Sequence, residues 1–480
     1  MQWNDRGDVM KVAEFKAKKI FSEASGSCAV VDDNIKMNLN EYGIYEEIVL
    51  LDEDDELDPV VEYVSPNFNS DANETEISKN LYGNIQDIQY DERIGYFKSL
   101  YAGHVNEGEY RDNGSSGGMG TWIFKELLEK DLIDGVIHVK ENSDKNSPIM
   151  FQYDISRSID EIKAGSKTKY YPVEFSKVMK IVKDVPGRYA IVGIPSFIMA
   201  IRLLAEKDDI IKDRIKYTVG LICGHQKSSK FAEAIAWQVG IKPGNLKHIN
   251  FRKKLLDKPA NNYGVEITGV IDGKEVTIVK PTKELLGQNW GQGYFKTKAS
   301  DFTDDVMNET ADITLGDAWL PEYTKDSKGN NVIVVRNPVI DDLIRKGIES
   351  GRLNLDVVDK ETIFKSQAAH YRHTHDELAY RLYKKDNAYE WRPKKRIEAS
   401  NDIPLLRRKV QDLREEISTK SHIIYKKAVE LDDLDYFKTE MGKLSKKYNQ
   451  LYRLMTIQKK GILGIVRTIF EKIKRKIKSD

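Results

Sequence analysis

The sequence has almost no cysteine, no long apolar run and no excess of one charge, and each absence excludes a class of protein. Its 480 residues include two cysteines, Cys28 and Cys223, too few for a disulfide framework or a four-cysteine metal site. Lys plus Arg and Asp plus Glu number 76 each, so we expect no nucleic-acid partner. No apolar run approaches the roughly 18–20 residues of a membrane span. Asp5, Arg6 and Asp8 interrupt any secretory signal, which predicts a cytoplasmic protein.

Strand-like and helix-like runs alternate in the middle of the chain. Apolar runs at residues 134–140, 187–195 and 216–224 each border a polar or glycine-rich loop and an amphipathic helix. This alternation is typical of an α/β domain with parallel strands. Ligands of such sheets bind at the carboxyl ends of the strands. We therefore predict a mixed α/β fold whose central domain spans residues 81–395.

Two β-hairpins and one linker are also predicted. Residues 28–49 alternate apolar and polar side chains around a turn at residues 40–43, as in a hairpin. Residues 263–282 do the same around Asp272-Gly273, a strong turn signal. Residues 1–60 form a small N-terminal module in this interpretation. The acidic segment 52–80 has the composition of a linker or surface loop.

The C-terminal 80 residues have a helical pattern. Residues 400–458 predict a helical hairpin with a turn at residues 431–435. Residues 459–480 carry isoleucines three or four apart and eight Lys and Arg against Glu471 and Asp480. Such a basic amphipathic helix suits an anionic membrane surface. Alternatively, its apolar stripe packs on the preceding hairpin and its charges are solvated.

The segment "RDNGSSGGMG", residues 111–120, places a loop of small residues before a helix. The first amide groups of a helix lack internal partners and attract anions, and glycines let a phosphate approach the backbone. The loop lacks the Walker and dinucleotide spacings. A phosphate site is one interpretation, and a flexible turn with a serine cap is the other. The candidate phosphate contacts are Arg111, Gly114, Ser115, Ser116, Gly117 and Gly118.

Six segments in order resemble one family. They are "DERIGYFKSLYAGHVNEGEYRDNGSSGG", "GSKTKYYPV", "RYAIVGIPSFIMAIR", "VGLICG", "INFRKK" and "SDFTDDVMNETADITLGDAW". Together they resemble the beta subunit of coenzyme F-420 hydrogenases and dehydrogenases, over roughly residues 20–340. The resemblance implies a flavoprotein that binds FAD, with iron–sulfur clusters in a ferredoxin-like N-terminal module.

The cysteines that would hold those clusters are missing. The family motif GTPCQ stands here as "GIPSF" with Ser196, and a later CxxC becomes Lys296 and Ala299. A cluster with four iron atoms needs four thiolates. We therefore expect a degenerate ferredoxin-like module at residues 1–60 and no iron–sulfur cluster. A flavin can still pass a hydride between two-electron partners.

The resemblance implies the remaining site residues. Lys167 could hold phosphate or an anionic flavin, and Cys223 and His225 could act as a redox thiol or a proton donor; a polar turn and a packed remnant cysteine are the alternatives. Asp301 and Thr303 could bind ribityl or ribose hydroxyls or merely cap a helix. The further candidate cofactor contacts are Ser166, Tyr170, Gly193, Pro195, Gly316 and Asp317. His370, His373 and His375 lie close together, but without zincin spacing we predict no metal site.

The expected function is that of an FAD-dependent reductase. Its hydride donor would be a reduced deazaflavin of the F-420 type or NAD(P)H. The resemblance makes a small-molecule or lipid-linked sugar acceptor plausible, in cell-surface polysaccharide or glycolipid biosynthesis. Such an enzyme could work in the cytoplasm at the inner face of the membrane. Two alternatives remain: a non-catalytic docking relative, and a transferase that uses a nucleotide-sugar.

Overall fold

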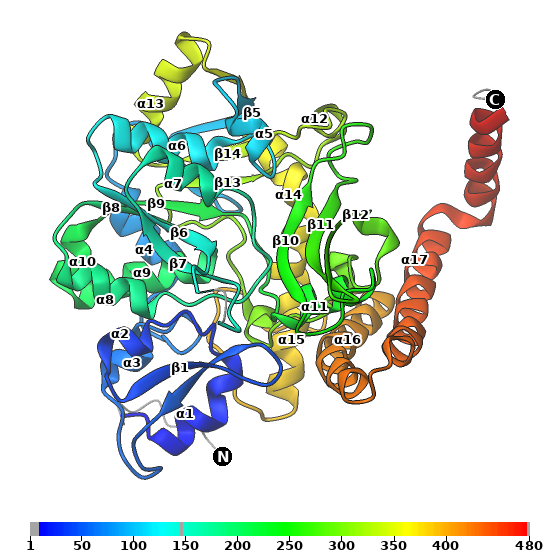
Figure 1. Ribbon diagram of the computed structural model, residues 1–480, viewed down its shortest axis with the longest axis horizontal. Helices are drawn as coiled ribbons and strands as arrows, with labels where there is room; N and C mark the ends of the chain where they lie inside the picture. Colours follow the sequence, from blue (N-terminus) through cyan, green and yellow to red (C-terminus); the bar gives the residue numbers. More distant parts are fainter. Residues whose placement is uncertain (1–8, 145–146, 478–480) are drawn as a thin grey trace.

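A mixed eight-stranded sheet lies at the centre of the computed structural model, which describes residues 9–144 and 147–477 (Figure 1). The strand order is β15 (Leu353–Val357), β5 (Ser99–Val105), β14 (Asn331–Val335), β13 (Ile313–Asp317), β9 (Ile215–Leu221), β8 (Tyr189–Gly193), β6 (Gly135–Glu141) and β7 (Phe151–Ser156). The four strands β13, β9, β8 and β6 are parallel, and the flanking strands are antiparallel. The predicted α/β class is confirmed.

Helices cover both faces of this sheet. One face packs against α6 (Met119–Glu129), α7 (Ile159–Ala164) and α13 (Pro338–Glu349). The other packs against α8 (Ser176–Asp184), α9 (Pro195–Lys207), α10 (Asp209–Arg214) and, further along, α14 (Lys360–Thr374). Strand β8 contributes side chains to both faces. Ala190 packs in the hydrophobic core on the α6 side of the sheet, while Tyr189 and Ile191 pack in the core on the α9 side. A strand buried on both faces needs apolar residues at every position.

The N-terminal part contains short helices and one hairpin. Strands β1 (Ile35–Leu39) and β2 (Tyr45–Val49) pair antiparallel as predicted. Helices α1 (Val12–Lys18) and α2 (Cys28–Val31) precede the hairpin. The linker prediction for residues 52–80 is wrong, because α3 (Pro59–Tyr63) and α4 (Glu74–Tyr82) form there. Both helices have Asx caps, at Asp58 and Asn73, and each buries an apolar face.

A second, antiparallel sheet consists of β10 (Leu246–Lys253), β11 (Gly264–Ile271) and β12 (Lys274–Pro281). The predicted Asp-Gly hairpin is confirmed, with φ values of 49° at Asp272 and 74° at Gly273. Both turn residues are left-handed, as a two-residue hairpin turn requires. Helix α11 (Lys230–Trp237) shares a hydrophobic core with this sheet.

The C-terminal helices are α15 (Asp376–Asn387), α16 (Leu405–Glu430) and α17 (Leu434–Ile477). Helix α17 does not end near residue 458, as the sequence predicted, but runs on to Ile477. Tyr425, Phe437 and Met441 of this hairpin pack in the same core as Phe231 and Phe295. Residues 478–480 of the predicted basic helix lie outside the described residues. Across the described part of the chain, none of the helices combines the length and apolarity of a membrane span.

Candidate cofactor site

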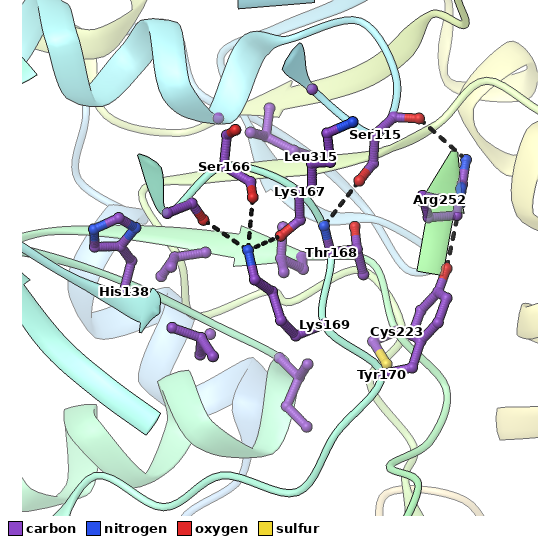
Figure 2. Close-up of a pocket in the computed structure, with 18 of the residues that line it drawn as sticks. Ser115, His138, Ser166, Lys167, Thr168, Lys169, Tyr170, Cys223, Arg252 and Leu315 are labelled. Carbon is purple, nitrogen blue, oxygen red and sulfur yellow. Dashed lines mark hydrogen bonds between the residues drawn. The ribbon is translucent and has the colours of Figure 1, made fainter. Parts of the chain in front are cut away.

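A cavity of about 320 Å³ opens at the carboxyl ends of the parallel strands (Figure 2). Its wall includes the ends of β8, β9 and β13, the loop 114–118, the first turn of α6 and the segment 165–173. This is the edge where ligands of doubly wound sheets bind. The sequence prediction of a site at these strand ends therefore coincides with a cavity.

The loop before α6 turns sharply at Gly118, whose φ is 88°. A Cβ atom on Gly118 would lie 2.6 Å from the Tyr110 carbonyl oxygen, so glycine is required for both conformation and space. Gly114, Ser115, Ser116 and Gly118 line the cavity. Gly117 instead packs against the sheet, where a Cβ would lie 2.6 Å from the Gly103 carbonyl oxygen and from Asn331 Oδ1.

Two backbone donors of α6 are available to a ligand. Gly120 and Thr121 line the cavity, and within the described residues their N–H groups have no acceptor. The N–H of Met119, by contrast, donates to Asn331 Oδ1 at 3.3 Å. Unpaired amides at a helix N-terminus, with the helix dipole behind them, form an anion site.

The segment 165–169 is tied to this loop. Thr168 N–H donates to Ser115 Oγ at 2.8 Å, and Ser166 Oγ donates to the Asn113 carbonyl at 3.2 Å. The Lys169 ammonium donates to the carbonyl oxygens of residues 165, 166 and 167 at 3.0, 2.6 and 2.9 Å (Figure 2). Burial lowers the pKa of Lys169 to about 8. Lys169 therefore fixes the shape of this wall and leaves Lys167 to face the cavity.

Lys167 is a free cation of the cavity wall. Its φ is 80°, a left-handed value that is strained for lysine. Within the described residues its ammonium forms neither an ion pair nor a hydrogen bond. Burial and the nearby Lys253 lower its pKa. A strained, unpaired lysine in a cavity is suited to an anionic ligand.

Arg252 and Asp317 form a fork-to-fork ion pair in the wall, with N–O distances of 2.9 and 3.2 Å. The guanidinium lies 4.2 Å from the Tyr263 ring centre and 5.4 Å from that of Trp319. It also donates to the Tyr170 hydroxyl and, at 3.4 Å, to the Ser115 carbonyl (Figure 2). Arg252 Nε is buried without an acceptor in the described structure. A buried donor of this kind normally has a partner.

The cavity wall is strongly cationic. It contains Lys167, Lys169, Lys227 and Arg252, and among the described lining residues Asp317 is the one carboxylate. Lys167, the free amides of α6 and the orphaned Arg252 Nε fit a ligand that carries phosphate. The residues present therefore fit a phosphate-bearing dinucleotide such as FAD.

Cys223 and His225 lie at the end of β9 and line this cavity. The Cys223 thiol donates to the His225 carbonyl oxygen at 3.3 Å and not to its imidazole. Burial raises the pKa of Cys223 and lowers that of His225 well below its usual value. The thiol is therefore protonated and the imidazole neutral. His225 Nε2 is buried without a partner among the described residues.

A second cavity of about 1090 Å³ adjoins the first. Tyr170, Ile222, Cys223, His225, Arg252 and Asp317 line both. The second wall adds Tyr263, Trp290 and Trp319, together with several amide side chains. Two ligands could thus meet across one shared wall.

Several predicted residues lie outside the cavity wall. The Arg111 guanidinium pairs with Asp326 and donates to the Gly329 carbonyl at 2.9 and 3.1 Å. Pro195 occupies the first turn of α9. Asp301 is buried in an ion pair with Lys296, and Lys296 and Lys298 lower its pKa against the effect of burial. Thr303 follows the short helix 299–302 beside it. The structure therefore does not bring Arg111, Pro195, Asp301, Thr303 or Gly117 to the cavity.

The three clustered histidines have separate partners. His370 Nδ1 lies 3.0 Å from Gln367 Oε1, and the His375 ring stacks on Tyr371. His373 is buried beside Arg381 and Arg414. Over residues 9–144 and 147–477, no three His, Cys, Asp or Glu side chains are placed to hold a metal ion.

The two cysteines are also separated. Cys28 lies in the N-terminal core, 3.0 Å from Ser65 Oγ, whereas Cys223 lines the cofactor cavity. Lys296, at the position of a family cysteine, is occupied by its ion pair with Asp301. These residues do not fit a cluster that needs four thiolates.

Sequence reasoning did not select several lining residues. His138, Lys227 and Asn331 line the first cavity and Trp290 lines the second, but no motif marks them. Arg252 is different, because "INFRKK" predicts either a contact with anionic cofactor groups or a solvated face for it, and it lines both cavities. Its role depends on Asp317, 65 residues away.

An α/β sheet with a cationic cavity at its parallel strand ends, next to a second cavity, is suited to a cofactor-dependent enzyme. Comparison with known families makes this specific. Residues 100–180 match the model of the coenzyme F420 hydrogenase/dehydrogenase beta subunit N-terminal region, and residues 187–361 match that of its C terminus. The chain belongs to this family of oxidoreductases, and the resemblance seen in the sequence is confirmed.

Two known proteins are similar to this chain. The F420-dependent formate dehydrogenase subunit beta of Methanocaldococcus jannaschii is 34% identical over 109 residues, which are 22% of this chain and 27% of that protein. The match thus spans about a quarter of that relative. A chain of the F420-reducing NiFe hydrogenase complex from Methanosarcina barkeri aligns with a TM-score of 0.47 and 16% identity, covering 63% of this chain and 97% of that one.

Proposed function

We propose that this protein is an FAD-dependent reductase that moves a hydride from a reduced deazaflavin or NAD(P)H to an organic acceptor without iron–sulfur clusters. The observation that carries the proposal is the cationic cavity at the N-terminus of α6, with its two free amides and the orphaned Arg252 Nε. Membership of a coenzyme F420-linked family supports a flavin or deazaflavin reaction.

The chain's own residues would act in three ways. The amides of Gly120 and Thr121, with Lys167 and Arg252, would hold phosphate. FAD, when bound, would supply the two-electron chemistry. His225 Nε2, neutral and without a partner in the described chain, would exchange a proton with the acceptor across the shared wall. Cys223 would remain a thiol and contribute shape to that wall.

The second cavity would take the acceptor. Trp290, Trp319 and Tyr263 offer flat apolar surfaces, and amide side chains in the same wall offer paired donors and acceptors. Such lining suits a ligand with ring faces and many hydroxyl groups. A small-molecule or lipid-linked sugar of a cell-surface polysaccharide or glycolipid pathway has this chemistry.

An absorbance spectrum of the purified protein tests the reductase proposal. We expect the bands of oxidised flavin, no broad iron–sulfur shoulder, and release of FAD on denaturation. Anaerobic addition of NADPH or of a reduced deazaflavin should bleach the flavin bands. A protein that stays colourless after incubation with FAD contradicts the proposal.

A colourless protein would favour the second candidate, a non-catalytic docking relative. Internal ion pairs at two predicted cofactor contacts, Arg111 and Asp301, favour that candidate. The cavity's unpaired Lys167 and free α6 amides favour the enzyme.

We also propose that residues 459–480 bring the enzyme to the cytoplasmic face of an anionic membrane. The eight Lys and Arg of this segment support the proposal, because each basic residue near an anionic leaflet contributes about 1 kcal/mol. The full chain should sediment with vesicles of phosphatidylcholine and phosphatidylglycerol, and a chain that ends at residue 458 should not. Equal sedimentation of both chains contradicts the proposal.

A further inference from the structure

Lys227 is a buried lysine among the residues that line the first cavity. It lies between β9 and α11 and is 3% exposed. The ammonium lies 4.9 Å from the Phe231 ring centre and 4.7 Å from that of Trp290. Its hydrogen bond goes to the Tyr294 carbonyl oxygen. No sequence motif marks this residue.

Nothing anionic in the described structure pairs with Lys227. No carboxylate forms an ion pair with it over the residues that the structure describes. Its neighbours add positive charge: Lys296 faces it across an isolated β-bridge, and Arg414 lies close enough to act on it electrostatically. The carboxylate of Asp301 is already engaged by Lys296 and Lys298. Three other titratable groups act on Lys227. Burial lowers the pKa values of His225 and His422, which are therefore neutral, and raises the pKa of the Cys223 thiol, which stays protonated.

An unpaired buried ammonium is costly. Removing an ion from water without a counter-charge costs several kcal/mol even after the protein relaxes, and the protein usually responds by neutralising it. Burial and the two cationic neighbours lower the pKa of Lys227 well below its usual value. A negative charge placed in the cavity would reverse this balance and hold Lys227 in its charged form.

We propose that Lys227 is the counter-charge for an anionic group in this cavity, and that this group is the ring of the reduced flavin. The inference rests on the proposed function. A ring that reacts with a ligand in the second cavity must lie at the shared wall, to which Cys223 and His225 contribute. Lys227 follows His225 by two residues, whereas the phosphate-binding amides belong to α6.

The electron balance explains the charge. A hydride from a nicotinamide or a deazaflavin carries two electrons and one proton. Its transfer to an oxidised flavin leaves one negative charge on the ring unless a second proton follows. The Lys227 ammonium would offset that charge, and the ring would lose it again when the hydride passes to the acceptor. No further oxidant or reductant is required.

The test compares Lys227→Met with Lys230→Met in the full-length protein loaded with FAD. Lys230 lies on the same segment but pairs with Glu233 at 2.8 Å and does not line the cavity. We expect Lys227→Met to keep FAD but to lower the flavin midpoint potential. Its affinity for sulfite, which forms an anionic adduct with the oxidised ring, should fall about tenfold or more. Lys230→Met should match the unsubstituted protein in both measurements.

Three results overturn the inference. The first is an unchanged potential and sulfite affinity in Lys227→Met. The second is weaker FAD binding with an unchanged potential, which would assign Lys227 to the phosphates. The third is an unsubstituted protein that takes up no FAD; it defeats the proposed function as well and is recognised before any variant is made. If Lys227→Met does not fold, Lys227→Gln replaces it, and Lys227→Arg should preserve sulfite affinity in either case.

Discussion

Individual glycines of the loop before α6 have different tasks. Gly117 closes the loop onto the sheet, and its carbonyl accepts from Val105 N–H at 2.9 Å. Ser116 Oγ donates to the Asn330 carbonyl at 2.8 Å, so this hydroxyl is committed to the protein. Gly120, one turn further, faces the cavity, and a Cβ there would make an ordinary 3.6 Å contact with Leu315. Packing and ligand binding can therefore be separated by substitution.

Gly117→Ala and Gly120→Ala form a matched pair. Gly117→Ala should lower the thermal midpoint by several degrees, since its Cβ would lie 2.6 Å from two protein oxygens and relieving such overlap costs about 1–3 kcal/mol. Gly120→Ala should keep or raise the midpoint, because alanine in a helix is favoured by about 1 kcal/mol. Its methyl group beside the free amides should instead weaken FAD binding. Calorimetry and FAD titration of both variants check this, and equal midpoints would contradict the packing argument.

Sequence reasoning found the loop but misassigned some of its neighbours. The position of Arg111 just before the loop and the family resemblance at Asp301 predict cofactor contacts for both. Their partners are Asp326, 215 residues after Arg111, and Lys296, whose pairing needs the segment 296–301 to fold back on itself. Whether a charged side chain faces a ligand or another part of the chain depends on how the chain folds, even where the partner is only five residues away.

Secondary structure elements were more predictable than side-chain partners. Strands β8 and β9 followed from continuous apolar runs, and the β11–β12 hairpin from its Asp-Gly turn, because these signals are local. Helices α3 and α4 were missed, since an acidic, Asn-rich composition indicates a loop while their Asx caps and buried Val61 and Ile77 stabilise helices. Composition alone therefore gave the wrong prediction for residues 52–80, where helix caps and tertiary packing both stabilise helices.

Helix α17 has two parts with different surroundings. Phe437, Met441, Leu444 and Tyr448 are buried against the rest of the protein, whereas Leu454 and Ile457 are 49% and 42% exposed. The Tyr294 hydroxyl donates to the Met441 carbonyl at 3.0 Å and so ties this helix to the segment beside the second cavity.

Truncation distinguishes these two parts. A chain ending at residue 458 should keep the thermal midpoint of the full protein and unfold in one transition. A chain ending at residue 433 should lose the four buried side chains of α17, each worth about 2 kcal/mol or more, and should unfold at a much lower temperature. Circular dichroism in the near and far ultraviolet follows both. An unchanged midpoint for the shorter chain would show that α17 is an independent unit.

At the scale of the whole molecule, the two cavities form where the two sheets and the C-terminal helices contact one another. The first cavity is lined by the large sheet and by Arg252 of the second sheet, and the second cavity adds Ser445 and Asn449 of α17. Each layer could be predicted from periodicity, but their contact could not, because hydrophobic faces specify burial without specifying the partner. The second cavity therefore could not be predicted from the sequence.

Burial of titratable groups makes the stability of the whole fold depend on pH in two opposite ways. Burial lowers the pKa values of His138 and His422 to about 4. In the unfolded chain these histidines bind protons near pH 6.5, whereas in the native state they stay neutral down to about pH 4. The free energy of unfolding therefore decreases as the pH falls from 6.5 toward 4. Burial raises the pKa of Glu23 to about 7, although Lys395 opposes the effect. The native state retains this proton longer than the unfolded chain, so stability falls as the pH rises from about 4.5 to 7.

Glu23→Gln should isolate the second effect. Glutamine cannot ionise, so the variant should gain up to about 3 kcal/mol over the unsubstituted protein at pH 8. That gain should fall to a few tenths of a kcal/mol near pH 4.5, where Glu23 is protonated in the native state and half protonated in the unfolded chain. With Glu23 removed, the acid loss caused by the histidines should appear as a steeper fall of the thermal midpoint between pH 7 and pH 5. Calorimetry across this range measures both. A gain that is equal at pH 4.5 and pH 8 would mean that Glu23 acts through packing and not through its proton, because a group 8% exposed can destabilise the fold by shape as well as by charge.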